Sequence, residues 1–258
     1  MDNPIFETSQ LSKTFGGLTA ISDFSFKVMR GQIKSIIGPN GAGKTTLFNI
    51  ITGIFPPTGG IVQFKGKIIN GEKPHRIAQR GISRTFQTLE LFGNMTVLEN
   101  VMVGRHVRTR MGLLRSGLRL PGLKKEEWGI RENAQERLNM VGLSHKANEP
   151  VPGLPLGEQK LVEVARALAT DPELILLDEP AAGLNETEMI RMAEIIRKIR
   201  EQGVTVLLVE HHMDLVMGIS DEITVLNYGM KIAEGAPEEI KKDQKVIDAY
   251  LGEETEYD

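Results

Sequence analysis

The sequence predicts an α/β fold in which a helical segment interrupts a core of strands and helices. Apolar runs of strand length alternate with helical patterns over residues 33–64 and 174–234, whereas residues 96–169 show mainly helical patterns. The chain has 258 residues, of which 40% are hydrophobic and 25% charged, enough for one large domain with a subdomain or at most two small domains. This composition excludes a chain that is disordered throughout.

The first part of the chain is predicted to be rich in β structure. Alternation of apolar and polar residues indicates strands over the first thirty residues, and Gly53 follows the first helix where a left-handed residue commonly ends one. The elements expected here are, in order, a strand that includes Phe24, Phe26 and Val28, a turn over 30–32, a strand over 33–37, a helix from Lys44 to about Thr52, and strands around Ile61 and Phe64 and over 82–86.

Helical patterns begin at Thr96, which has capping-box spacing to Glu99. The later elements expected are helices over 126–140 and 158–169, a strand over 174–177, a helix from Asn185 to about Gln202, a strand over 204–209, and a hairpin of 222–226 and 230–234. We therefore expect the first part of a core over 1–93, a helical subdomain over 94–170, and the second part of the core with a C-terminal segment over 171–258.

Charge and residue usage exclude several classes of protein. With 31 Lys and Arg against 34 Asp and Glu, the chain is not a globally basic nucleic-acid binder. Having no cysteine, it has no disulfides, thiolate nucleophile or cysteine-bound metal. It also lacks the roughly 18 consecutive apolar residues of a membrane-spanning helix and a basic-then-apolar leader. We expect a cytosolic protein, with any membrane role depending on a separate membrane partner.

One segment, Arg105–Lys125, is locally basic, with seven Lys or Arg and no acid. Such a segment can meet lipid headgroups or nucleic acid. It lacks the interleaved aromatics expected of a single-strand binder, so a solvated insertion is favoured, with a partner-facing role second.

A phosphate-binding loop is the clearest motif. The sequence Gly38-Pro39-Asn40-Gly41-Ala42-Gly43-Lys44-Thr45 matches G-x-x-x-x-G-K-[ST] and lies between a predicted strand and a predicted helix. In such loops the backbone N–H groups wrap the phosphates, the lysine reaches the β- and γ-phosphates, and the hydroxyl holds Mg²⁺. We expect ATP and Mg²⁺ to bind through Gly38–Thr46, with Thr46 included. The alternative is a glycine-rich turn, which the strand–loop–helix context disfavours.

A pair of carboxylates, Asp178 and Glu179, ends the apolar strand over 174–177. An acid at such a strand end can meet the metal of a phosphate site, and an adjacent acid can deprotonate an attacking water. The alternative is two acids that cap a surface turn before Pro180. The complete phosphate loop upstream favours a metal role for Asp178 and a catalytic role for Glu179.

Together these motifs resemble the ATP-binding subunit of an ABC transporter, from about Phe6 to Leu251. The resemblance implies a P-loop NTPase core of the ABC ATPase type, with an N-terminal antiparallel β region and a helical subdomain. It implies that Phe15 stacks on adenine, although a core phenylalanine remains equally open. It also implies that Gln87 links Mg²⁺ and water to the helical subdomain, and that His211 touches the γ-phosphate.

The family's signature, Leu-Ser-Gly-Gly-Gln, is altered. The matching residues are Leu154, Pro155, Leu156, Gly157 and Glu158, followed by Gln159. Pro155 removes a hydroxyl and an N–H, and Leu156 adds a side chain where a phosphate would approach the backbone. Glu158 adds a negative charge near a triphosphate. We expect a weakened contact to ATP bound by a partner cassette.

Several further segments resemble the ATP-binding subunits of branched-chain amino-acid importers: Gly16–Ala20, Arg84–Gln87, Glu99–Gly104 and Glu210–Met217. This implies two permease subunits, a second and different ABC ATPase, a periplasmic or extracellular receptor, and a peripheral position on the cytoplasmic face of the cell membrane, with no nucleic acid. Lipopolysaccharide-export and urea-import ATPases share several of these segments. A soluble ABC ATPase would usually show long coiled coils or two cassettes, and a slowly hydrolysing nucleotide-binding regulator stays open.

Overall fold

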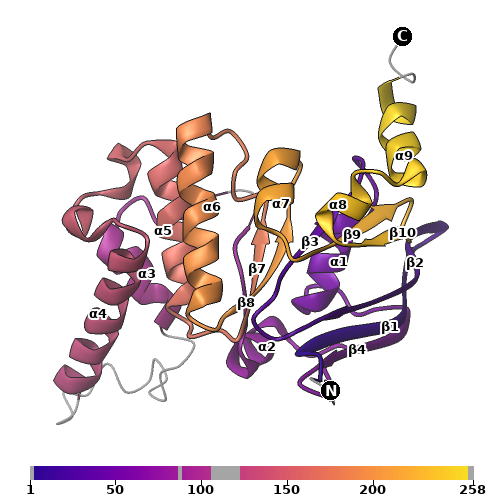
Figure 1. Ribbon diagram of the computed structural model, residues 1–258. Helices are drawn as coiled ribbons and strands as arrows, with labels where there is room; N and C mark the ends of the chain where they lie inside the picture. The colour runs from indigo at the N-terminus through magenta and orange to yellow at the C-terminus, as the bar shows by residue number, and fades with distance from the viewer. Residues whose placement is uncertain (1–2, 87–88, 106–122, 255–258) are drawn as a thin grey trace.

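The computed structural model describes the backbone of residues 3–86, 89–105 and 123–254, and the side chains within these ranges except those of 123–126 and 251–254 (Figure 1). Within them the strands form two sheets. Several helices gather at one end of the molecule and an antiparallel sheet lies toward the other end, with the larger sheet between them (Figure 1). This is the α/β class that the sequence predicted.

The larger sheet contains six strands from the described residues, in the order β10-β9-β3-β8-β7-β6. Its strands are parallel except for β10 at one edge. Strands β3, β7 and β8 are buried at every position, which explains their continuous apolar runs. Their bounds are β3 (Ile33–Ile37), β6 (Ile82–Arg84), β7 (Leu174–Asp178), β8 (Thr205–Val209), β9 (Glu222–Asn227) and β10 (Met230–Gly235).

The second sheet is antiparallel, in the order β2-β1-β4-β5. It shares an apolar core with helix α1 and with one face of the larger sheet, including Phe24, Phe48 and Leu176. The alternation at Phe24, Phe26 and Val28 is therefore confirmed as the buried face of β2. The bounds are β1 (Phe6–Phe15), β2 (Leu18–Val28), α1 (Lys44–Ile51), β4 (Gly59–Phe64) and β5 (Lys67–Ile68).

The helical end consists of α3, α4 and α5 with two 3₁₀ turns. The capping box at its start is confirmed, since Thr96 N–H donates to Glu99 Oε2 at 2.8 Å and Glu99 N–H donates to Thr96 Oγ1 at 3.2 Å. These helices share one apolar core with α6, β7 and β8. The bounds are α3 (Val97–Arg105), α4 (Leu123–Met140), the turns Ser144–Lys146 and Val151–Gly153, α5 (Leu156–Leu168) and α6 (Glu186–Glu201).

The other helices are α2 (Pro74–Arg80), α7 (Met213–Ile219), α8 (Pro237–Ile240) and α9 (Gln244–Glu254). The sequence patterns did not predict them, because short helices such as α2, with Ile77 as its buried residue, carry little periodicity. Residues 106–122 of the basic segment lie outside the described residues. In the part of the chain that the structure describes, every helix is too short or too polar to traverse a bilayer.

Candidate nucleotide-binding site

Two glycines shape the loop between β3 and α1, because a side chain at either position would collide with neighbouring backbone. A Cβ atom on Gly38, whose φ is +152°, would lie 1.9 Å from the Leu226 carbonyl oxygen. A Cβ on Gly43, at φ +106°, would lie 2.6 Å from the Ala20 carbonyl oxygen. The loop is therefore packed against β9 and the start of β2, and these neighbours fix its shape.

Lys44 begins α1 and is 6% exposed. Its ammonium donates hydrogen bonds to the carbonyl oxygens of Gly38 at 2.5 Å and Pro39 at 2.8 Å, so it lies across the loop. Gly43 is the N-cap of α1, and among the described residues no side chain caps this N-terminus. Uncapped N–H groups at a helix N-terminus favour an anion. The loop thus combines a cation with backbone donors at one position.

The loop borders a cleft of about 470 Å³. The structure places most of the predicted site residues on the walls of this cleft. Residues at the end of β1, at the start of β2 and in the β9–β10 turn complete the walls. The cleft is lined by Phe15, Leu18, Thr19, Ala20, Asn40, Gly41, Ala42, Gly43, Lys44, Thr45, Thr46, Glu179, His211 and Tyr228. Loop, carboxylate and histidine therefore meet at one cleft although they are far apart in the chain.

Asp178, the last residue of β7, is 3% exposed and pairs with a residue that sequence reasoning did not assign to the site. Arg84 Nη2 donates to Asp178 Oδ2 at 2.7 Å, and both side chains are buried. Burial raises the pKa of Asp178, while the hydrogen bond and the charge of Arg84 act in the opposite direction. An arginine beside a buried carboxylate far away in the chain has no local sequence signal.

Glu179 has a φ of +48°, uncommon for a residue with a side chain. Its backbone is held on both sides: its N–H donates to Val209 O at 2.9 Å, and Lys160 Nζ donates to its carbonyl oxygen at 3.0 Å. Its carboxylate Oε1 lies 3.1 Å from His211 Nε2. Non-glycine residues at positive φ concentrate at functional sites, where surrounding contacts hold them. The structure brings Glu179 and His211 into contact.

Glu210 is a further residue that the sequence analysis did not single out. It is 1% exposed. Its Oε1 accepts a hydrogen bond from Ala181 N–H at 2.6 Å, and its Oε2 accepts from His211 N–H at 2.9 Å and His212 N–H at 3.3 Å. One carboxylate thus joins the segment after Glu179 to the segment that carries the histidine.

Two aromatic side chains also border the cleft. Phe15 is 41% exposed, meets the Phe55 ring edge-on at 5.4 Å, and has Lys13 Nζ 4.8 Å from its centroid. This exposure removes the core alternative for Phe15. Tyr228, missed by the sequence analysis, is 78% exposed in the β9–β10 turn, where the adjacent Gly229 N–H donates to Ala42 O at 2.9 Å.

The altered signature surrounds the start of α5. Leu154 is buried, Pro155 is the N-cap without a side-chain cap bond, and Leu156 is 42% exposed. A Cβ on Gly157 would lie 2.6 Å from Glu188 Oε1. Pro155 and Leu156 are exposed at this helix N-terminus, whereas Leu154 and Gly157 are buried, and none of the four is among the residues that line the cleft.

Glu158, the acid of this altered signature, has a counter-ion that sequence reasoning missed. Its carboxylate accepts a hydrogen bond from Lys146 Nζ at 2.6 Å, and that bond raises the pKa of Lys146. The negative charge expected from Glu158 is therefore partly offset in the fold.

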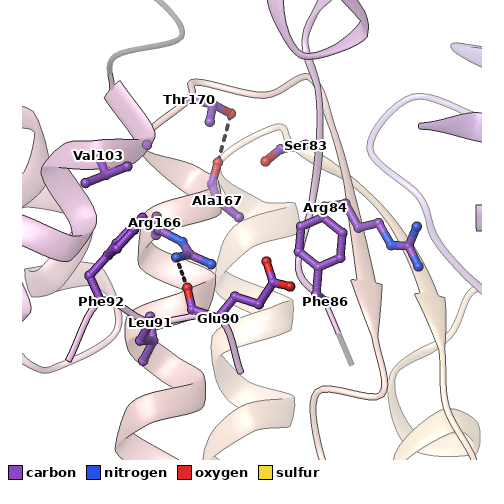
Figure 2. Close-up of a pocket in the computed structure, with 11 residues that line it drawn as sticks. Ser83, Arg84, Phe86, Glu90, Leu91, Phe92, Val103, Arg166, Ala167 and Thr170 are labelled. Carbon is purple, nitrogen blue, oxygen red and sulfur yellow. Dashed lines mark hydrogen bonds between the residues drawn. The ribbon is translucent and has the colours of Figure 1, made fainter. Parts of the chain in front are cut away.

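Gln87 and Thr88 lie outside the described residues, whereas Phe86 lies within them. Phe86 N–H donates to Glu163 Oε1 at 3.0 Å, and burial raises the pKa of Glu163. Phe86 and Phe92 line a second cavity of about 510 Å³ between β6 and helices α3 and α5 (Figure 2). Figure 2 shows the Arg84 guanidinium pointing away from Phe92.

The chain belongs to the ABC transporter family of ATP-binding proteins. The family model described as ABC transporter matches residues 21–182, and a model described as branched-chain amino acid ATP-binding cassette transporter matches residues 230–256. The chain is 45% identical over 254 residues to BraF of Pseudomonas aeruginosa and 42% identical over 254 residues to LivG of Escherichia coli, both called high-affinity branched-chain amino acid transport ATP-binding proteins. Each alignment covers 98% of this chain and 100% of the relative.

Solved structures of ABC transporter cassettes also resemble this chain. A nucleotide-free ATP-binding cassette of an ABC transporter aligns with a TM-score of 0.84 at 36% identity, covering 96% of this chain and 99% of that one. A cassette in its ADP conformation aligns with a TM-score of 0.85 at 35% identity, covering 97% and 99%. The predicted family and fold class, including the antiparallel β region, are confirmed. The cassette binds ATP, and ATPase activity follows from its family.

Proposed function

We propose that this chain hydrolyses ATP to drive the import of branched-chain amino acids through a membrane permease. The supporting observation is a single cleft that unites the phosphate loop, Glu179 and His211, with Asp178 at the adjoining strand end. The substrate comes from the relatives, whose names specify branched-chain amino acid transport.

Each group has a chemical task in this proposal. Lys44 and the N-terminus of α1 bind the phosphates. The Glu179 carboxylate orients the attacking water and accepts its proton, and the His211 imidazole, 3.1 Å from that carboxylate, contacts the γ-phosphate. The positive φ of Glu179 keeps its side chain in the cleft, because the backbone around it is hydrogen-bonded on both sides.

The donor set at the strand end suits Mg²⁺. The Thr45 hydroxyl and the Asp178 carboxylate are hard oxygen ligands, and Mg²⁺ is commonly held by one or two carboxylates with substrate phosphates and water. Among the described residues no group of three or more His, Cys, Asp or Glu could hold a metal ion. A bound Mg²⁺ would neutralise charge on the phosphates. Gln87 stays a predicted ligand and catalytic residue.

Partners follow from the family and from the altered signature. ABC import implies permease subunits, and we propose two of them, with an external receptor, holding this chain at the cytoplasmic face of the membrane. A homodimer would place Pro155 and Leu156 against both ATP sites. A second, different cassette with an intact signature would complete the site built on Lys44 and Glu179, so we propose a heterodimer.

The test is reconstitution of this chain with the proposed permeases and second ATPase, in liposomes that contain ATP. We expect uptake of leucine, isoleucine and valine in the presence of the receptor, and none when Glu179→Gln replaces the native chain. Urea serves as the competing substrate. ATP-dependent urea uptake without amino-acid uptake would overturn the substrate, and uptake independent of ATP would overturn the function.

The heterodimer has its own test in the ATPase activity of the isolated chain. We expect low activity, raised by the double substitution Pro155→Ser and Leu156→Gly because the partner-facing N–H and hydroxyl groups return. The control is Ile68→Gly, because the Ile68 side chain is exposed in β5, outside the signature. Brisk hydrolysis by the isolated native chain as a homodimer would refute the requirement for a second cassette.

A further inference from the structure

Arg84 joins elements on both sides of the predicted metal site. Its side chain is 6% exposed at the end of β6. Besides the 2.7 Å bond to Asp178 on β7, its Nη1 donates to Asn49 Oδ1 on α1 at 2.7 Å and to Oγ1 of Thr52, the C-cap of α1, at 3.3 Å. One guanidinium therefore bridges the end of β7 and the helix that follows the phosphate loop.

Aromatic rings restrict the same guanidinium. Its carbon lies 5.4 Å from the centroid of Phe48 and 5.2 Å from that of Phe86. A planar cation held by rings and by directional hydrogen bonds has few alternative rotamers. Arg84 is thus a rigid connector between its partners.

The face of α1 that Arg84 contacts is the face that carries Thr45. Asn49 follows Thr45 by four residues and Thr52 follows Asn49 by three, which is the spacing of neighbours on one side of a helix. Among the described residues, the hydrogen bonds of the Asp178 carboxylate go to Arg84 through Oδ2. Arg84 therefore sets the position of the carboxylate relative to the helix face of the Thr45 hydroxyl.

We propose that Arg84 is a positioning residue for the magnesium site, which holds the Asp178 carboxylate in register with Thr45. It acts through Asp178 and touches neither nucleotide nor metal. This inference rests on the proposed use of Mg²⁺ and ATP. Removing the guanidinium should weaken metal binding while leaving the loop's contacts to the phosphates intact.

The test compares Arg84→Met, which keeps an unbranched apolar stem, with Arg84→Lys, which keeps a positive charge but lacks the planar guanidinium that donates to two partners at once. Arg80→Met is the matched control, since Arg80 on α2 makes a two-bond pair with Glu72 that is half-exposed and outside the cleft. ATP affinity is measured by calorimetry in EDTA. The affinity of the ATP-loaded protein for Mn²⁺, a spectroscopic substitute for Mg²⁺, is measured by electron paramagnetic resonance.

We expect Arg84→Met to weaken Mn²⁺ binding by about 10-fold or more, the usual effect of removing a group that orients a metal ligand. Its ATP affinity in EDTA should stay within about twofold of the native value, since the phosphate loop is untouched. Arg84→Lys should fall between Arg84→Met and the native protein, and Arg80→Met should match the native protein.

Native-like or tighter Mn²⁺ binding by Arg84→Met would overturn the proposal, whatever its melting temperature. If Arg84→Met fails to bind ATP in EDTA because it does not fold, Arg84→Lys decides by the same criterion. Native protein that binds ATP equally with and without the metal would instead defeat the proposed use of Mg²⁺. The two failures are therefore distinguishable.

Discussion

Replacing Glu210 with Met tests how the cleft's histidine segment is held to the segment after Glu179. The side chain length is similar, but the substitution removes the acceptor of the Ala181, His211 and His212 amides. Ala181 is fully buried, so its N–H loses its hydrogen bond without access to water, whereas both histidines are exposed. The main cost therefore comes from one amide and smaller costs come from the others.

The magnitude follows from this difference in burial. An unsatisfied buried N–H costs about 1–3 kcal/mol. The two histidine N–H groups would hydrogen-bond to water instead of Glu210, which adds about 1 kcal/mol, so the free energy of unfolding should fall by roughly 2–4 kcal/mol. For a chain of this size that corresponds to a fall of about 5–12 °C in melting temperature. Turnover should fall as well, because Glu210 would no longer hold the segment after Glu179 to the segment that carries His211.

The assay is thermal unfolding followed by circular dichroism, together with ATPase activity in the assembled transporter. Glu210→Gln should lie between the native protein and Glu210→Met, because the carboxamide keeps one acceptor oxygen and turns its NH₂ group toward the remaining donors. Glu201→Gln, exposed at the end of α6, is the matched control. A melting temperature of Glu210→Met within about 1 °C of the native protein would refute the reasoning, since no buried amide would then depend on Glu210.

Three further outcomes are expected. Glu179→Gln should keep ATP binding but abolish hydrolysis, because a carboxamide cannot accept the proton of water; unchanged turnover removes Glu179 from the base role. Phe15→Ala should weaken ATP binding by roughly 1–3 kcal/mol, the scale of base stacking, without changing tripolyphosphate binding or the apo melting temperature; a large loss of apo stability would contradict this. Burial raises the pKa of Glu163 above 4.5, so the native state retains its proton while the unfolded chain ionises. The free energy of unfolding of the native protein relative to Glu163→Gln should therefore fall as the pH rises above 4.5. If chemical denaturation shows that this difference in free energy is independent of pH, the raised pKa of Glu163 is excluded.

The parts of the site with local signals were predictable. The phosphate loop is set by glycines and by the strand and helix that flank it, and Asp178 with Glu179 ends an apolar run. The connectors were not predictable, because their partners are distant in the chain: Arg84 and Asp178 are 94 residues apart, and Glu210 and Ala181 are 29 apart. Sequence patterns record which residues avoid water, but not which buried charges meet.

The backbone of Glu179 shows a second limit. Its positive φ follows from hydrogen bonds to Val209 and Lys160 on other elements, and a glutamate carries no sign of that conformation. In the same way, the ion pair by which Lys146 partly offsets the negative charge of Glu158 depends on a turn that precedes α5. The altered signature could be located from sequence, but the counter-ion that reduces its charge could be identified only from the fold.

The position of β3 in its sheet has a consequence for synthesis of the protein. The strand that leads into the phosphate loop pairs with β8 and β9, which begin at Thr205 and Glu222, and the loop itself packs against Leu226 and Gly229. On a ribosome the loop emerges long before these neighbours exist, so most of the chain must be made before the loop has its final shape. Such long-range pairing also slows folding. A nascent chain that ends before Thr205 carries the complete phosphate-loop sequence without the strands that flank β3. The contacts that shape the loop are therefore complete only after translation has passed Gly229.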